Sequence, residues 1–340
     1  MSIFTCIYNI VVNSGRRPKI IWSLIRRAII HIVANKAECR MMVHGFMLTM
    51  PFSHQLPLHL SEFPFYDSLP SRIASFVRSN YGYFNCIDVG ANIGDTLAAF
   101  KAKSREDKNI SSNFIAIEPN PHYRKFLENN WGNESTIMIL SCLCSSNEGE
   151  AEAVIHEKHG TAAITASSTF DVNRIRKFDM RTVDSLANEY KKENGYNVIK
   201  VDTDGHDYDV LMGSRKLIEE NKPFVLFELD NFNDDKFAQK ITEIFSLFQE
   251  SGYKRFLVYD SYGYLMGIYS LDDILSFYSL IFYKLTSKFK YFDLLFIAEK
   301  YIDEFYKEEM RVFADNPENN PADAIAANHL IDKLRASKEL

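Results

Sequence analysis

The sequence predicts a doubly wound α/β fold, in which a mostly parallel sheet carries helices on both faces. Short apolar runs alternate with stretches of helical character through the middle of the chain, as crossover connections between parallel strands require. The first run also breaks into a glycine-containing turn at Gly90, directly before a helix. The expected strands lie near residues 84–89, 113–118, 136–143, 197–202 and 223–229.

An apolar stretch precedes this alternating core. Residues 20–33 contain Arg26 and Arg27, so the stretch is too short and too charged to span a bilayer. It predicts an amphipathic helix that packs on the core or on a partner. The alternative is a helix whose basic face lies on a membrane surface.

A second N-terminal segment, residues 41–70, is rich in proline and histidine. This composition predicts a short strand and an irregular, lid-like loop that closes over the cofactor or the acceptor of the core. His54 and His59 lie in this loop, and we expect them to be structural rather than catalytic.

Two further apolar runs, 255–260 and 291–297, follow the core and predict a hairpin-like pair with a helical insertion between them. The chain beyond residue 299 is charged and helical, and a linker at 316–321 precedes a last helix. The predicted organisation is an N-terminal helical segment with the lid-like loop (1–75), a core domain (76–299) and a C-terminal helical tail (300–340).

The composition of the chain excludes some classes of function. The 340 residues are 46% hydrophobic, which suits a sizeable core, and their net charge of −6 argues against a nucleic-acid partner. Five cysteines spread over the chain do not form a disulfide framework, so a reducing cytoplasm is expected. No complete targeting or membrane signal is recognisable.

The glycine turn points to the cofactor. A dinucleotide site would read G-x-G-x-x-G and hold a pyrophosphate at the helix start. Here Asn92 takes the middle position and Asp95 follows Gly94, and an acidic side chain would repel a pyrophosphate. S-adenosylmethionine (SAM) carries a sulfonium and an ammonium but no phosphate, so the turn favours SAM over NAD. Glu118 ends the second strand, where such folds hold ribose hydroxyls; the alternative is a helix-capping or solvent-facing acid.

With these motifs the chain resembles the FkbM-type SAM-dependent methyltransferases. The resemblance covers roughly residues 80 to 230 in unbroken order. It implies a Rossmann-like class I methyltransferase sheet that ends with an antiparallel strand, and O-methyl transfer onto a small-molecule or glycan acceptor, commonly a sugar or polyketide hydroxyl. It rests on residues 88–96, 117–121, 182–186, 199–205, 210–213 and 224–228.

The predicted cofactor site combines these motifs. Gly90, Asn92 and Gly94 form the floor under the methionine moiety, and Glu118 binds the ribose. The region after the third strand lines the adenine. The complete predicted set is Asp88, Gly90, Ala91, Asn92, Gly94, Thr96, Glu118, Pro119, Asn120, Cys142 and Leu143.

O-methylation also needs a group that takes the proton of the acceptor hydroxyl. The predicted catalytic residues follow the fourth and fifth strands: Asp202, Asp204, His206 and Glu228. His206 has a suitable intrinsic pKa, and the carboxylates are alternatives. A second route uses Mg²⁺, with Asp202, Asp204, Glu228 and Asp230 as oxygen ligands. The family often has Asp-Val-Glu-Gly where this chain has Asp202-Thr203-Asp204-Gly205.

Two other functions stay open at this point. A nicotinamide-dependent oxidoreductase would share the strand, turn and helix, although the glycine spacing and Asp95 oppose it. A catalytically inactive member of the family would keep the fold as a binding or scaffold protein, because one sequence does not show whether an acceptor pocket is intact.

Overall fold

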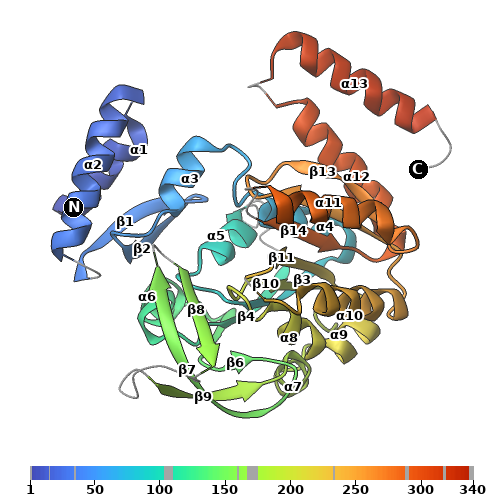
Figure 1. The fold of residues 1–340 in the computed structure, drawn as a ribbon, viewed down its shortest axis with the longest axis horizontal. Coiled ribbons are helices and arrows are strands. Elements are labelled where there is room, and N and C mark those ends of the chain that lie inside the picture. Colours follow the sequence, from blue (N-terminus) through green and yellow to red (C-terminus); the bar gives the residue numbers. More distant parts are fainter. Residues whose placement is uncertain are drawn as a thin grey trace.

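An eight-stranded sheet forms the centre of the molecule (Figure 1). This computed structural model describes residues 2–14, 16–33, 36–102, 110–158, 161–166, 175–232, 234–287, 291–316 and 319–336. In spatial order the strands are β13 (Leu265–Ser270), β12 (Arg255–Asp260), β14 (Phe292–Phe296), β11 (Phe224–Leu229), β10 (Val198–Val201), β3 (Tyr83–Val89), β4 (Ser111–Ile117) and β5 (Ile137–Leu140).

The strand directions confirm the predicted fold class. Strands β11, β10, β3, β4 and β5 pair in parallel, whereas β14 enters antiparallel between β11 and β12. All five core strands expected from the sequence are present, and the runs 255–260 and 291–297 do pair with each other. The edge strand β13, which pairs antiparallel with β12, was not predicted.

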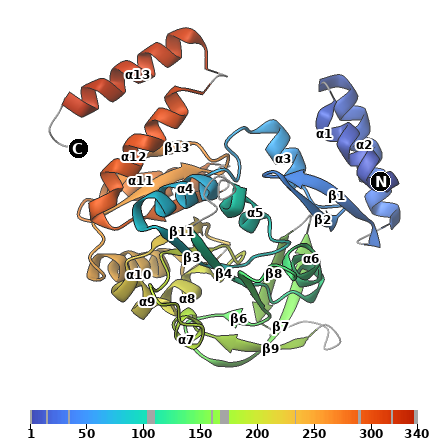
Figure 2. The ribbon, with the colours of Figure 1, turned by 180° about the vertical axis from the view of Figure 1, so that it is seen from behind.

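Side chains on the two faces of the sheet build two separate cores. Along β3, Phe84 and Cys86 join one core while Ile87 and Val89 join the other, as the two-residue period of a strand requires. The first core packs under α4 (Leu69–Tyr81), α5 (Asp95–Ala102), α6 (Pro121–Trp131) and α12 (Glu299–Ala314). The second core packs under α7 (Val183–Glu189), α8 (Asp207–Met212), α9 (Arg215–Asn221), α10 (Phe237–Glu250) and α11 (Ile274–Thr286), of which α8, α9 and α10 gather on one side of the sheet (Figure 2).

A second, four-stranded sheet is inserted between β5 and α7, and the sequence analysis did not predict it. Its order is β6 (Leu143–Cys144), β9 (Arg176–Arg181), β7 (Gly149–Lys158) and β8 (Thr161–Ala166). The apolar cluster of its own has two buried members among the described side chains, Ala153 and Phe178, so these strands carry little hydrophobic signal.

The N-terminal segment adds two helices, a hairpin and a short helix: α1 (Ile3–Asn13), α2 (Arg16–Val33), β1 (Glu38–Val43), β2 (Phe46–Pro51) and α3 (Leu56–Glu62). Both α2 and the C-terminal α13 (Pro321–Ala336) lie at the outside of the molecule, away from the central sheet (Figures 1 and 2). None of the helices within the described ranges has the length and apolar character that a membrane span needs.

Candidate active site

A cavity of about 390 Å³ opens at the carboxyl ends of β3, β4 and β10. Residues of the N-terminal segment form part of its lining. Ten of the residues predicted from the sequence line this cavity: Gly90, Asn92, Thr96, Glu118, Pro119, Cys142, Leu143, Asp202, Asp204 and His206. Residues outside that prediction include Asp95, Tyr123, Lys200 and, from the N-terminal segment, His54, Gln55, Leu56, His59 and Tyr66.

Gly90 begins the turn after β3, and its backbone requires glycine for two reasons. Its φ of 83° lies in the left-handed region, and a Cβ atom there would fall 1.8 Å from the carbonyl oxygen of Asp202. The end of β10 therefore packs directly against the turn. Gly94, with a φ of 84°, has a different neighbour: its Cβ would lie 2.3 Å from the Trp131 ring. Close packing of α6, rather than the cavity, accounts for Gly94.

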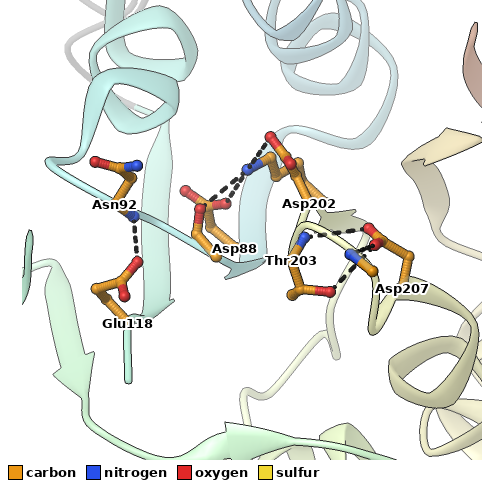
Figure 3. Close-up of polar contacts among 9 residues, drawn as sticks. Asp88, Asn92, Glu118, Asp202, Thr203 and Asp207 are labelled. Carbon is orange, nitrogen blue, oxygen red and sulfur yellow. Dashed lines mark hydrogen bonds and ion pairs between the residues drawn. The ribbon is translucent and has the colours of Figure 1, made fainter. Parts of the chain in front are cut away.

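Glu118 joins the end of β4 to the glycine turn. One carboxylate oxygen accepts a hydrogen bond of 2.8 Å from the backbone N–H of Asn92 (Figure 3). The other accepts one of 2.8 Å from the N–H of Asn120. The side chain is buried, and this burial raises the pKa of Glu118 to about 7, although the two N–H donors oppose the shift. Each oxygen keeps a second lone pair for a ligand hydroxyl.

Asn120 and Ala91 support this arrangement from outside the cavity lining. The side chain of Asn120 caps α6 by accepting from the His122 N–H at 2.9 Å, and Ala91 is buried in the first core. Proline at the next position suits a first helical turn, whose N–H groups have no partner within the helix.

Lys200 is a site residue that the sequence analysis did not single out. Its ammonium lies 3.4 Å from the fully buried Asp88 and 3.4 Å from Asp202, and it donates to the Gly90 carbonyl at 3.2 Å. Burial alone would lower the pKa of Lys200, but the charges of Asp202 and Asp88 outweigh it and raise the pKa. The lysine therefore stays charged and holds β3 and β10 together beneath the cavity.

The turn after β10 is fixed by Asp207, the first residue of α8. Its carboxylate accepts from the Thr203 N–H at 3.2 Å, from the Thr203 hydroxyl at 3.2 Å and from the Gly205 N–H at 3.3 Å (Figure 3). Asp204 and Gly205 have φ values of 50° and 121°, so the turn is tight. It presents Asp202, Asp204 and His206 to the cavity.

The N-terminal residues that line the cavity, from His54 to Tyr66, are called its roof here, and they are held by hydrogen bonds from the N-terminal helices. Arg26, on α2, donates to the carbonyl oxygens of Phe52 and His54 at 2.7 and 2.9 Å, and the Tyr8 hydroxyl of α1 also donates to the His54 carbonyl. The His54 ring is buried, and burial lowers its pKa to about 4, so it is neutral at pH 7. The helices thus position the residues that close the cavity.

A smaller cavity of about 130 Å³ adjoins the first, and both are lined by Leu56, Tyr66, Asp95, Thr96, Lys200 and Asp202. Glu228 lines this second cavity and not the first. Asp293 of β14, which the sequence did not indicate, lies opposite Glu228 in the strand register.

The four acids considered as Mg²⁺ ligands are not brought together. Asp202 lines both cavities, Asp204 lines the first alone and Glu228 the second alone, and Asp230 lines neither but pairs with Lys284 at 2.5 Å. Within the described ranges, no group of three or more His, Cys, Asp or Glu side chains is arranged to hold a metal ion.

The strand order, the glycine turn after β3, the carboxylate at the end of β4 and the antiparallel β14 define a Rossmann-like methyltransferase fold. The family model described as Methyltransferase FkbM domain matches residues 88–255. This chain therefore carries a methyltransferase domain of the FkbM family, which confirms the resemblance seen in the sequence. No curated protein matches the chain in sequence.

Several solved methyltransferase structures are similar to this chain at low sequence identity. The structure of methyltransferase FkbM from Methylobacillus flagellatus KT is 14% identical, with a TM-score of 0.39, and the match covers 85% of this chain and 58% of that one. Precorrin-6y C5,15-methyltransferase from Geobacter metallireducens GS-15 is 8% identical, with a TM-score of 0.34 and coverage of 68% and 88%. The plantazolicin methyltransferase BpumL, solved in complex with SAH, is 8% identical, with a TM-score of 0.32 and coverage of 68% and 83%.

Proposed function

We propose that this protein is a SAM-dependent O-methyltransferase that acts on a hydroxyl of a sugar, a glycan or a related natural product. The observation that carries the proposal is the position of Glu118 beside the glycine turn, at the edge of a cavity that also receives the Asp202 turn. The FkbM domain match over the same residues supports methyl transfer as the chemistry.

The charges around the cavity support SAM as the cofactor. Carboxylates of Asp95, Glu118, Asp202 and Asp204 line it, against the ammonium of Lys200, which is already paired with Asp88 and Asp202. Such a lining suits a cofactor that carries a sulfonium and an ammonium and disfavours a pyrophosphate. Glu118 would hold the ribose hydroxyls, and the Cys142–Leu143 region would line the adenine.

When bound, SAM supplies an electrophilic methyl group. The contribution of the chain is to orient the acceptor hydroxyl and to take its proton. Asp202 and His206 both line the cavity, so the carboxylate or the imidazole can receive that proton. Turnover by Asp202→Asn and His206→Ala variants on an identified acceptor would separate the two. Loss of activity on chelation, followed by its return with Mg²⁺, would favour the metal-assisted route instead.

Calorimetric titration of S-adenosylhomocysteine (SAH) tests the cofactor assignment. We expect wild type to bind SAH and Glu118→Ala to bind it about 10- to 100-fold more weakly, the effect of losing a charged hydrogen-bond partner. Glu128→Ala is the matched control, because the Glu128 side chain is 57% exposed on the surface of α6. Wild type that does not bind SAH would overturn the proposed function, whereas equal binding by the Glu118 variant would remove Glu118 from the site.

Transfer of a labelled methyl group from SAM to glycans extracted from the source cells tests the reaction itself. The product is expected to gain the mass of one methyl group. SAH binding without transfer to any such acceptor would favour the binding or scaffold function.

We further propose that α2 places the enzyme against an anionic membrane surface. Ile20, Ile21, Leu24 and Ile32 on α2 are 58%, 60%, 58% and 82% exposed, and the first acidic residue of the chain is Glu38. Arg27 is exposed beside these apolar side chains, in a segment without acidic residues, and this is the pattern of helices that lie in a membrane interface. All five cysteines are free, which supports the cytoplasmic side as the location.

Vesicle co-sedimentation tests the membrane proposal. We expect binding to phosphatidylcholine vesicles that contain phosphatidylglycerol, little binding to pure phosphatidylcholine, and loss of binding in Ile21→Asn/Leu24→Asn. The matched control is Ile325→Asn/Leu330→Asn on α13, where the two side chains are 72% and 59% exposed. An equal loss in the control, or equal binding to both kinds of vesicle, would contradict the proposal.

A further inference from the structure

Two carboxylates face one another in the second cavity. Glu228 of β11 and Asp293 of β14 are register partners on antiparallel strands, and both line this cavity. Register partners project from the same face of a sheet, and like charges placed directly opposite destabilise it. Among the described residues, neither carboxylate has a hydrogen-bond or ion-pair partner.

No group of the described protein neutralises the charge of the Glu228–Asp293 pair by direct contact. Burial raises the pKa of both groups well above the ordinary range, and the charge of Asp202 raises each further. Both side chains are half-buried, and a carboxylate that is partly removed from water without a partner costs free energy, so a fold retains one where a ligand supplies the missing donors.

A third group in the same cavity also lacks a partner. Ser261, in the loop after β12, is only 6% exposed and lines the cavity, and within the described ranges its hydroxyl has no hydrogen-bond partner. Its loop is held in place by Gly263, where an added Cβ would fall 2.2 Å from the Phe65 carbonyl. The serine is therefore fixed beside the two acids as a third polar group available to a ligand.

The overall charge of the cavity selects the kind of ligand. Its lining includes the acids Asp67, Asp95, Asp202, Glu228 and Asp293 and a single cation, Lys200. The lysine is already engaged by Asp88 and Asp202. A phosphorylated or carboxylated ligand would be repelled, and a neutral polyol would leave the negative charge uncompensated, whereas an ammonium supplies three donors and a positive charge.

We propose that the second cavity is the acceptor subsite and that Glu228, Asp293 and Ser261 bind a protonated primary amine carried by the acceptor close to its methylated hydroxyl. This inference rests on the proposed methyltransferase function. The shared wall formed by Tyr66 and Asp202 places such an acceptor next to the cofactor cavity. The substrate class is an amino sugar or another amino alcohol.

Binding of two sugars that differ at one position tests the inference. D-glucosamine and D-glucose are titrated at pH 7 into the full chain saturated with SAH, by calorimetry or saturation-transfer NMR. Wild type is expected to prefer glucosamine about tenfold or more, the effect of pairing a half-buried charge. Glu228→Gln and Asp293→Asn, which are close in shape to the native side chains, are each expected to lose this preference. Asp235→Asn, at an exposed acid outside both cavities, is expected to keep it.

Three results would overturn the inference while SAH binding remains normal: no binding of glucosamine, equal binding of the two sugars, or an unchanged preference in both variants. A second measurement distinguishes the ammonium of the acceptor from the ammonium in the amino-acid part of the cofactor. If the variants weaken SAH but not 5′-methylthioadenosine, which lacks the amino-acid part, the pair binds the cofactor and not the acceptor. Wild type that fails to bind SAH would instead overturn the proposed function.

Discussion

Lys200 on β10 lies in register with Asp88 on the parallel strand β3, and the ammonium and carboxylate are 3.4 Å apart. The Asp88 side chain is fully buried, so its charge has no access to water. An ion pair in this position connects the strand that ends in the glycine turn to the strand that ends in the Asp202 turn. The geometry of the cofactor cavity depends on it.

Replacing Lys200 with methionine is expected to destabilise the protein by about 3–5 kcal/mol, because it leaves the Asp88 charge buried and unpaired. The free energy of unfolding from urea titration measures this loss. The double variant Lys200→Met/Asp88→Asn should recover most of it, since no buried charge remains. Strictly additive effects of the two substitutions would show that the pair is not coupled.

The pKa of Glu118 predicts a pH-dependent stability. Its folded value of about 7 lies above the ordinary 4.5, so the folded state binds the proton more tightly than the unfolded state does. This contribution is complete below pH 4.5 and is lost as the pH rises through 7, a fall of about 3 kcal/mol. Glu118→Gln should remove that part of the slope of unfolding free energy against pH. The exposed control Glu128→Gln should keep the wild-type slope, and equal slopes in all three proteins would contradict the assignment.

Gly90→Ala is expected to abolish SAH binding and to destabilise the fold by more than the strain of its positive φ alone. The added Cβ would overlap the Asp202 carbonyl, which is backbone and cannot rotate away. Gly82 is the matched control: its φ is 72°, but an added Cβ there has no neighbour within 4 Å. Gly82→Ala should cost about 1 kcal/mol and leave SAH binding intact. Similar losses in the two variants would mean that φ, and not the contact, decides the effect.

Arg26→Met should loosen the roof of the cofactor cavity. It removes the donors to the Phe52 and His54 carbonyls, at a cost of about 1–3 kcal/mol for a buried acceptor left unsatisfied. Because His54 lines the cavity, SAH binding should also weaken, by about tenfold. Arg27 is exposed on the same helix, so Arg27→Met is the control and should change neither property. Unchanged SAH affinity in Arg26→Met would separate the N-terminal helices from the site.

The sequence was informative where function and structure depend on neighbouring residues. The run from Cys86 to Gly94 contains both the strand and the turn, so its role followed from local chemistry. The strand that precedes Glu118 was also predicted, for the same reason. The four-stranded sheet was not predicted, because β7 and β9 bury few apolar side chains and carry acidic and basic residues on their exposed faces.

Long-range contacts explain the other residues that were missed. Lys200 is one cation in an apolar strand, and the identity of its partners depends on which strands are neighbours in the sheet. Asp293 reaches Glu228 only because β14 enters between β11 and β12. His54 was expected to be structural; it lies in the loop between β2 and α3, and its position at the cavity depends on Arg26 in α2, far away in the sequence.

The two cavities also differ in when their residues become available during synthesis. The residues that line the first cavity lie between His54 and His206, whereas the second requires Ser261, Tyr291 and Asp293. A chain released from the ribosome from its N-terminus exposes the first set well before the second. Premature termination before β14 would therefore yield a polypeptide that contains every cofactor-lining residue but lacks one of the two facing carboxylates.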